Sequence, residues 1–473
     1  MNDRLAEALE YISDKHIAEA GTARRRHRRA ILGTIAAILA IVIFLNPPYI
    51  PRIVGAKLVS QASGSRAAER PDLDDYEPGD YQAALSIYQA HREQQQMRLE
   101  SALRDLSGFS RDSTLLYMEG ARDNRVWSPI NGYIALAMLA EITGGNSRQQ
   151  ILDALHISDP DTLRSHVEAL WEDSYFRHEN GNEACYLANS LWLDEGLRYN
   201  QETMDALAHH HYASIYQTDL QEKRAGKALQ SWLNNNTGGL LKDSVKNAGF
   251  HPESVLTLAS TIYLQGTWSD EFDPGNNTYD IFHAPSGDRG TTFMNKKLSH
   301  MDYYWGDSFG AVNLGMKNGT RMWLFLPDED KTVDDILRDG QYLEYLTDSY
   351  QGGVENKKYL KVNLSVPSFD IASGCDVAGL FREMGITDIF GFDTADFSAI
   401  TSDTPIVITA VNQAARVIID EQGVKAAAYL EIPGAGAAMP PEEIIDFILD
   451  RPFLFVIATY EGTPLFTGVV NEP

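Results

Sequence analysis

The chain has 473 residues, of which 44% are hydrophobic and only 19 are proline, so it can bury a large core and is not broadly disordered. Its formal net charge of −26 disfavours nucleic acid as a partner. The two cysteines, Cys185 and Cys375, lie far apart in the sequence and cannot form a disulfide framework. One bridge could form between them, but two unpaired buried thiols are the favoured alternative.

The N-terminal region carries the pattern of a membrane anchor. A charge-free run from Ala30 to Leu45 extends to about Ile50, which gives the length that a spanning helix needs. Five arginines precede it: Arg24, Arg25, Arg26, Arg28 and Arg29. By the positive-inside rule, residues 1–29 form a cytoplasmic basic tail and everything after Ile50 is extracellular.

Other interpretations of this region are a cleaved signal peptide, a buried core helix and a twin-arginine export signal. The long basic lead and the lack of a small-residue cleavage site directly after the apolar run favour a signal anchor over residues 30–50. We therefore expect a single-pass protein of the cell membrane, or a secreted protein if the anchor is cleaved.

Residues 51–105 are predicted to be a stalk. Val54–Asp80 is polar, contains Gly, Ser and Pro, and has no periodicity, which is typical of a linker. Residues 81–106 have apolar side chains at helical spacing, at Tyr81, Leu85, Tyr88, Leu99, Leu103 and Leu106. A solvated spacer helix is favoured over a weak oligomerisation segment.

Four further motifs follow in order along the chain. The first is Trp127–Asn131 together with Ala135–Leu139, and the second is Thr261–Trp268. The other two are Arg451–Phe455 and Pro464–Gly468, close to the C-terminus. Trp232, Thr237 and Gly239 form an additional short pattern.

The stretch between Asp420 and Pro441 combines two opposed signals. Alternate residues from Val424 to Pro433 suit a half-buried strand. The core side is Val424, Ala426, Ala428, Leu430 and Ile432, and the water side is Lys425, Ala427, Tyr429, Glu431 and Pro433. The glycines, alanines and prolines that follow cannot hold a β-ladder and invite proteolysis. These features fit two alternatives: a flexible loop with an alanine-rich strand stem, and an exposed loop that inserts as a strand after it is cut.

These motifs resemble those of the serpin family from about Leu106 to Pro473, and residues 106–473 are accordingly expected to form a serpin domain. In this resemblance, Trp127–Asn131 with Ala135–Leu139 is similar to the family's helix under the sheet, and Thr261–Trp268 is similar to its central strand. Arg451–Phe455 and Pro464–Gly468 are similar to its C-terminal strands. The hinge resemblance rests on Glu421, Gln422, Gly423, Val424, Lys425, Ala426, Ala427 and Ala428. The implied fold is α+β, with a large central β-sheet, two further sheets, about eight to nine helices and an exposed reactive loop over residues 421–442. The resemblance also implies a sheet-opening region that contains Ser128, Asn131, Ser260, Trp268 and Gln413.

The resemblance implies an inhibitor and not an enzyme. By the spacing from Glu421 to Pro440, the scissile bond joins Ala437 to Ala438, and an extracellular serine protease would be trapped there as an acyl-enzyme. The small residues before the bond favour an elastase-like or subtilisin-like target. A non-inhibitory binding scaffold and an inhibitor of a cysteine protease are the alternatives. We expect no metal, no cofactor and, given the acidic charge, no heparin site.

Two positions depart from the family pattern. Ser260 stands where the family usually has Asn, and Gln413 stands where it usually has His. Both replacements can donate and accept hydrogen bonds, so they could form an alternative pair beneath the opening sheet.

Two other motifs are expected to be structural. Gly306–Gly310 spells a nucleophile elbow around Ser308, but Ala311–Leu326 continues as strands and not as the helix that an elbow requires. His209, His210 and His211 are adjacent, so on a helix they point in different directions and cannot converge on one metal ion.

Overall fold

The structure is a computed structural model that describes residues 53–63, 78–177, 183–237, 239, 246, 248–251, 253–347, 353–403, 405–408, 411–424 and 443–473. The chain divides into two compact units, residues 1–49 with 64–94 and residues 50–63 with 95–473. In the first unit, the described residues form the N-terminal part of helix α4 (Pro78–Met118). The second unit holds the sheets and the remaining helices.

A nine-stranded sheet forms one half of the second unit. Its neighbouring strands, in order, are β15 (Ile444–Ile448), β11 (Lys357–Pro367), β8 (Gly287–Trp305), β9 (Phe309–Gly315), β10 (Arg321–Pro327), β16 (Phe453–Ala458), β17 (Pro464–Val470) and β2 (Arg125–Trp127). Strand β7 (Thr278–Ala284) also pairs with β8. Every residue of β16 and β17 is buried, and all of them except Thr467 are apolar.

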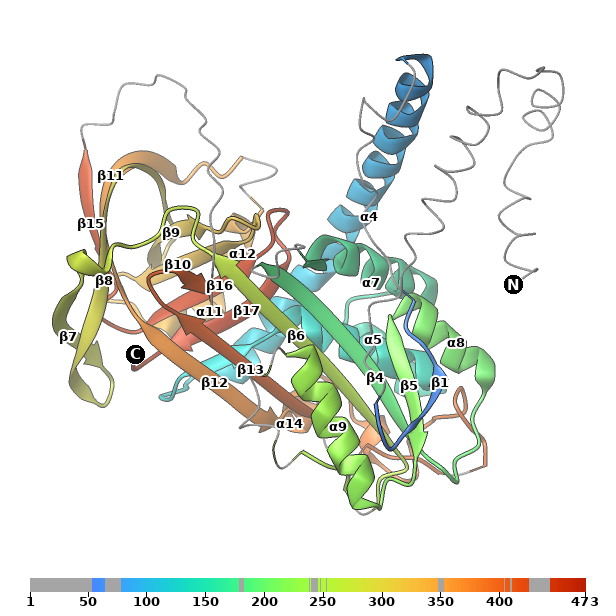
Figure 1. The fold of residues 1–473 in the computed structure, drawn as a ribbon. Coiled ribbons are helices and arrows are strands. Elements are labelled where there is room, and N and C mark those ends of the chain that lie inside the picture. The colour runs from blue at the N-terminus through green and yellow to red at the C-terminus, as the bar shows by residue number, and fades with distance from the viewer. Residues whose placement is uncertain are drawn as a thin grey trace. The chain divides into compact units, whose positions relative to one another are not determined.

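A six-stranded mixed sheet follows the path β1 (Lys57–Ser60), β5 (Ala213–Thr218), β4 (Ala184–Asp194), β6 (Leu256–Thr267) and β14 (Gly423–Val424), and the short β3 (Phe176–Arg177) pairs with β4. Strands β4 and β5 are parallel, and the other pairs are antiparallel. Strands β12 (Phe369–Asp376) and β13 (Asn412–Ile419) form a separate antiparallel ribbon. Figure 1 shows this ribbon and the long strands β4 and β6.

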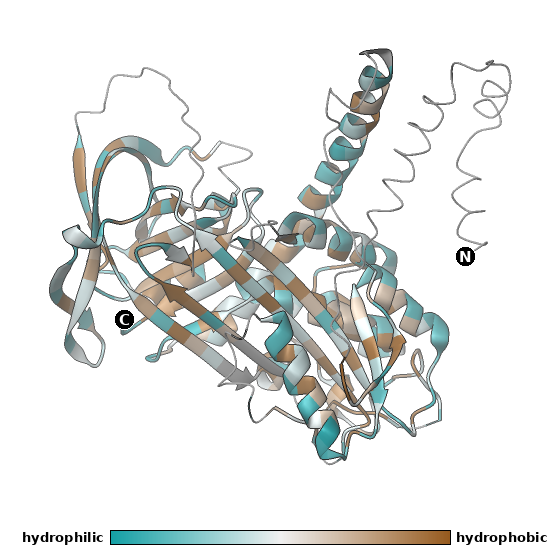
Figure 2. Cartoon of the chain, in the orientation of Figure 1, coloured by the Kyte–Doolittle hydropathy of each residue, from teal (hydrophilic) through white to brown (hydrophobic). Residues whose placement is uncertain are grey.

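Helix α5 (Pro129–Ile142) contacts both β6 and β17, so it links the two large sheets. It starts with a proline at its first turn, where the missing N–H costs nothing, and nearly all of its residues are buried. Helix α9 (Lys223–Asn236) buries Ala225, Ala228, Leu229 and Trp232 along one face and contacts β4 and β6. Figure 2 shows polar residues along much of α9 and apolar positions along the strands.

The other helices are short or lie at the edges. They are α6 (Gly145–Ala154), α7 (Pro160–Ser174), α8 (Gln201–His210), α11 (Val333–Asp339), α12 (Tyr342–Tyr345) and α14 (Ala378–Glu383), with 3-10 turns η2 (Pro274–Asn276) and η3 (Asp388–Phe390). The described residues thus contain nine α-helices and three sheets, so the expected α+β architecture is confirmed. Cys185 is a buried free thiol.

The predicted stalk needs two corrections. Lys57–Ser60, inside the expected linker, forms strand β1, because it pairs with β5 at the edge of the six-stranded sheet. The expected domain boundary at Leu106 falls within α4, where Leu99, Leu103 and Leu106 are buried. The apolar side chains of this half of the predicted spacer helix therefore pack into the core instead of facing solvent.

The expected anchor, residues 30–50, lies outside the described residues. Among the helices that the structure does describe, none combines the length and the apolar character that crossing a membrane requires.

Candidate functional site

The hinge begins with a tight turn after β13. Asp420 and Gly423 exchange two backbone hydrogen bonds, of 3.2 and 3.3 Å. The Asp420 side chain also accepts from the backbone N–H groups of Gln422 at 2.9 Å and Gly423 at 3.1 Å. An aspartate that bonds the backbone two residues later is a common way to fix such a turn. The turn reverses the chain so that the next residues run alongside β6.

The two residues after the turn pair with the end of β6. Gly423 lies opposite Thr267 and Val424 opposite Gly266, in antiparallel register. Gly423 has φ of +146°, and a Cβ atom there would lie 2.3 Å from the Gly266 carbonyl oxygen. Only glycine fits both the backbone angle and the close approach. Val424, the first side chain after it, is buried.

Residues just beyond β6 bind the same turn. The backbone N–H of Trp268 donates to Gln422 O at 3.0 Å, and its indole Nε1 donates to Asp420 O at 2.9 Å. Glu421 is held by the Phe272 N–H, which donates to its carbonyl at 3.0 Å, and by Asn277 Nδ2, which donates to its carboxylate at 2.5 Å. The start of the loop is therefore fixed while its first two residues already form part of the sheet.

Among the described residues, the rest of β6 has no strand paired with it on the β14 side. Strand β14 pairs with only two of the 12 residues of β6. Within the described part of the chain, β13 belongs to a different sheet, so it does not complete the ladder of β6 on that side. Unpaired backbone groups along a strand are a template for another strand.

A buried polar cluster lies beneath this edge. The Ser260 hydroxyl on β6 is 2.5 Å from Asn131 Oδ1 on α5 and 2.7 Å from Asn189 Oδ1 on β4. Asn131 Nδ2 donates to Ser260 O at 3.3 Å. Because a hydroxyl has one proton, it can donate to only one of the two amide oxygens at a time. This shared bond ties β6 to both the helix below it and its neighbouring strand.

The cluster continues to an ion pair between helices. Asn189 Nδ2 donates to His211 O at 2.8 Å, and His211 Nε2 lies 3.1 Å from Glu141 Oε2. Arg164 donates to both oxygens of Glu141, at 2.9 and 2.6 Å. Burial would raise the pKa of Glu141, but the hydrogen bonds from His211 and Arg164 outweigh it and lower this pKa to about 2. Burial lowers the pKa of His211, so its imidazole is neutral at pH 7.

The structure separates the expected sheet-opening residues. Asn131 and Ser260 are in direct contact, whereas the Ser128 hydroxyl donates to Leu465 O at 2.7 Å and ties α5 to β17. The backbone of Gln413 pairs with that of Cys375, but the Gln413 side chain lies outside the described residues. Its pairing with Ser260 therefore stays a prediction.

The hinge alanines Ala426, Ala427 and Ala428 and the expected scissile pair Ala437 and Ala438 also lie outside the described residues. Sequence reasoning missed Asn189, Glu141 and the buried role of His211. Of these three residues, only His211 carries a sequence signal, because it stands in a row of three histidines, and that signal does not indicate its burial.

The two motifs expected to be structural have ordinary partners. Ser308 lies in the turn between β8 and β9, donates to Asp339 Oδ2 at 2.8 Å, and is followed by a strand. His210 contacts Glu168 at 2.9 Å while His211 contacts Glu141, so these rings diverge. The described residues contain no cluster of three or more potential metal ligands.

Comparison with known proteins gives one consistent result. The family model described as serpin (serine protease inhibitor) matches residues 113–473. Serpin-Z1C of Triticum aestivum is 27% identical over 371 residues, which cover 75% of this chain and 91% of that protein. Alpha-1-antiproteinase 2 of Equus caballus is 25% identical over 362 residues, which cover 74% of this chain and 82% of that protein.

Solved structures show the same fold. The native state of tengpin, a thermophilic serpin, matches with a TM-score of 0.70 at 21% identity and covers 89% of this chain and all of that one. The complex of thyroxine-binding globulin with thyroxine matches with a TM-score of 0.63 at 20% identity, covering 78% of this chain and 99% of that one.

Proposed function

The chain belongs to the serpin family of serine protease inhibitors, and we propose that it is a suicide-substrate inhibitor of a serine protease that accepts small residues. Serpins inhibit proteases and do not act as enzymes themselves, and they generally form complexes with serine proteases. The observation that carries the proposal is the hinge, where Gly423 and Val424 already pair with β6.

The proposed reaction takes place at the bond between Ala437 and Ala438. The serine of the target protease attacks the Ala437 carbonyl, the bond to the Ala438 nitrogen breaks, and the carbonyl carbon remains attached to the protease as an ester. The new amino terminus at Ala438 takes up the proton that the serine released. Up to this point the protein behaves as an ordinary substrate.

Insertion then competes with hydrolysis. The residues from Val424 to Ala437 number fourteen and would span about 45 Å as a strand. Pairing them along the open edge of β6 supplies partners for backbone groups and drags the attached protease along the sheet. Deformation of the oxyanion hole of the protease then blocks the water-dependent release of the ester.

The proposed target class follows from the residues before the bond. Gly434, Ala435, Gly436 and Ala437 have no charge and almost no side chain. A trypsin-like pocket requires a cation and a chymotrypsin-like pocket a large ring. An elastase-like or subtilisin-like pocket therefore fits best. We further propose that residues 30–50 hold the inhibitor on the outer surface of the cell.

The test uses the full chain and an elastase-type serine protease, analysed on a denaturing gel with intact mass. We expect a covalent adduct whose mass is the sum of the two proteins minus that of a released fragment, and we expect that fragment to begin at Ala438. Clean cleavage with a fully active protease, repeated with a subtilisin-type enzyme, would contradict trapping and favour a binding scaffold.

A substitution at Val424 in the hinge tests in the same assay whether adduct formation requires insertion. Val424 is buried beside β6, so Val424→Lys is expected to be cleaved at an unchanged rate without forming the adduct. Val424→Ala keeps the site apolar and serves as the matched control, which should still form the adduct.

A further inference from the structure

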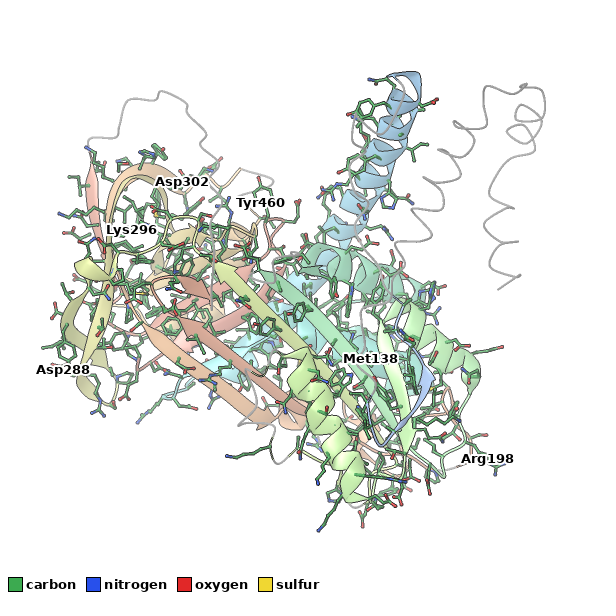
Figure 3. The ribbon with its side chains drawn as sticks, viewed as in Figure 1. Met138, Arg198, Asp288, Lys296, Asp302 and Tyr460 are labelled. Carbon is green, nitrogen blue, oxygen red and sulfur yellow. The ribbon has the colours of Figure 1, made fainter. Side chains whose placement is uncertain are left out.

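A second feature lies on the outer face of β7, β8, β11 and β15, next to the place where the reactive loop returns to the fold. A depression of about 520 Å³ opens there, and its lining includes Asp280, Ile281, Lys297, Asn363, Asp446 and Ile448. Figure 3 labels Lys296 on β8 and Asp288 on the β7–β8 hairpin, which border this region. We call these four strands and their outward side chains the β7–β15 face.

The face presents aliphatic side chains to solvent. Ile444 and Ile448 are 59% and 43% exposed on β15, and Ile281 is 48% exposed on β7. Side chains alternate along a strand, so Ile444, Asp446 and Ile448 point to the same side, while Phe447 between them is buried. Strand β15 therefore exposes Ile444 and Ile448 to solvent on the side that does not face the core.

Some charged side chains of the β7–β15 face have a partner of opposite charge and others do not. Lys296 is occupied by Asp270, with which it forms a 2.7 Å ion pair, and His283 lies 2.8 Å from Asp288. Asp446 accepts only a neutral hydrogen bond, from Asn363 at 2.7 Å. Within the described residues, Asp280 and Asp446 have no cationic partner, and the lining residue Lys297 has no ion pair. The two carboxylates outnumber the one unpaired lysine, so this face keeps an excess of negative charge, as the chain does with its net charge of −26, and it favours a basic partner.

Chain length limits what can reach this face. Ile444 follows Ala437 by seven residues, which span at most about 25 Å. A globular domain of about 220 residues has a radius of gyration of about 17 Å, so a protease held at Ala437 has a body larger than this tether. Whatever protease engages the loop is therefore kept within reach of the β7–β15 face.

We propose that the β7–β15 face is an exosite for the target protease, a second contact surface that seats a basic surface loop of the protease bearing an aliphatic side chain. The aliphatic group packs between Ile281 and Ile448, and lysine or arginine side chains beside it pair with Asp280 and Asp446. This proposal rests on the proposed function, because it requires that a protease binds the loop at Ala437. The exosite would favour basic proteases over other proteases whose substrate pocket accepts the same small residues. It would also raise the rate of association at low salt.

The test measures binding separately from trapping. The probe is a basic elastase-type protease whose catalytic serine is replaced by alanine, so that no acyl bond can form, and the partner is the full chain. We expect the combined variant Asp280→Lys with Ile448→Ala to raise Kd at least tenfold and to lose most of the salt dependence of the wild type. The control Asp307→Lys makes the same charge change at an exposed loop residue outside the depression and should leave Kd unchanged.

The outcomes separate this proposal from the previous one. Equal Kd for wild type and the combined variant overturns the exosite, whether or not the active protease forms a covalent adduct. A higher Kd for the combined variant than for the wild type supports the exosite, even if the active protease yields no adduct. A missing adduct would contradict only the trapping mechanism. Matching melting temperatures of the wild type and both variants check that these exposed substitutions leave the fold intact.

Discussion

A Cβ atom on Gly423 would lie 2.3 Å from the carbonyl oxygen of Gly266, nearer than any side-chain carbon can approach. The predicted reactive loop therefore starts at a position where the backbones of two strands touch without a side chain between them. The same glycine has φ of +146°, in a region that other residues rarely adopt. The hinge depends on this contact, because it lets Val424 lie beside β6 before any cleavage.

The first prediction concerns this contact. Gly423→Ala should disrupt the pairing of β14 with β6 and lower the free energy of unfolding by about 1–3 kcal/mol. With its first insertion step weakened, the loop should be cut more often per trapped protease. The measurements are urea unfolding and the number of inhibitor molecules consumed per inactivated protease.

The control is Gly385→Ala. Gly385 also has a positive φ, of +90°, but an added Cβ would meet no atom within 4 Å. It should lose stability through backbone strain while its trapping efficiency stays at the wild-type level. An equal loss of trapping in both variants would contradict a specific role for the contact with Gly266.

The second prediction concerns the hydroxyl shared beneath β6. Ser260→Ala removes the single hydroxyl proton that the buried Oδ1 atoms of Asn131 and Asn189 share. Such losses cost about 1–3 kcal/mol, which urea unfolding can measure. Ser231→Ala on the exposed side of α9 is the matched control and should change little. An unchanged midpoint in Ser260→Ala would show that the two amides find other donors.

The third prediction is a pH dependence from His211. Its folded-state pKa is lowered by burial, so between the ordinary value near 6.5 and the folded value the unfolded chain binds more protons. Stability should therefore fall as pH drops below about 6.5. Glu141, with a pKa of about 2, stays ionised throughout this range and loses its own contribution only below about pH 4.

The variant His211→Gln isolates this effect, since an amide can still donate toward Glu141 but does not titrate. The free energy of unfolding of both proteins is measured between about pH 5 and pH 8, and its slope against pH is compared between them. We expect the wild type to lose more stability than the variant toward the acidic end of this range. Parallel curves would show that His211 is not protonated on unfolding in this range.

The sequence predicted the elements that bear motifs but not the contacts between them. Thr261–Trp268 was expected to be a central strand and lies almost entirely in β6, and Ala135–Leu139 lies in α5. Asn189 was missed because it reaches Ser260 only through the register of β4 against β6, which is set by strand pairing over 71 residues of separation. A lone asparagine in an apolar run gives no sign of that partner.

Strand β1 was missed for a different reason. Lys57–Ser60 lies at a sheet edge, where only partial burial is required, so its four residues show no clear alternation of apolar and polar side chains. Its location among polar, glycine- and proline-containing residues then favoured a linker. Edge strands of this length are fixed by the strand they pair with, which the local sequence does not reveal.

The last prediction tests whether this N-terminal segment stabilises the domain. Ile53 is 7% exposed and packs in a small cluster with Trp192 and Trp232, beneath α9, whereas its neighbour Val54 is 86% exposed. Ile53→Ala should lower the free energy of unfolding by about 2–5 kcal/mol, because it removes buried methyl groups and leaves a cavity. Val54→Ala removes methyl groups that are already in water and should have almost no effect. Hydrogen exchange gives the local readout: amides of β5 and α9 should lose protection in the first variant alone. If both variants unfold at the same urea concentration, the burial of Ile53 contributes nothing measurable to the stability of the domain.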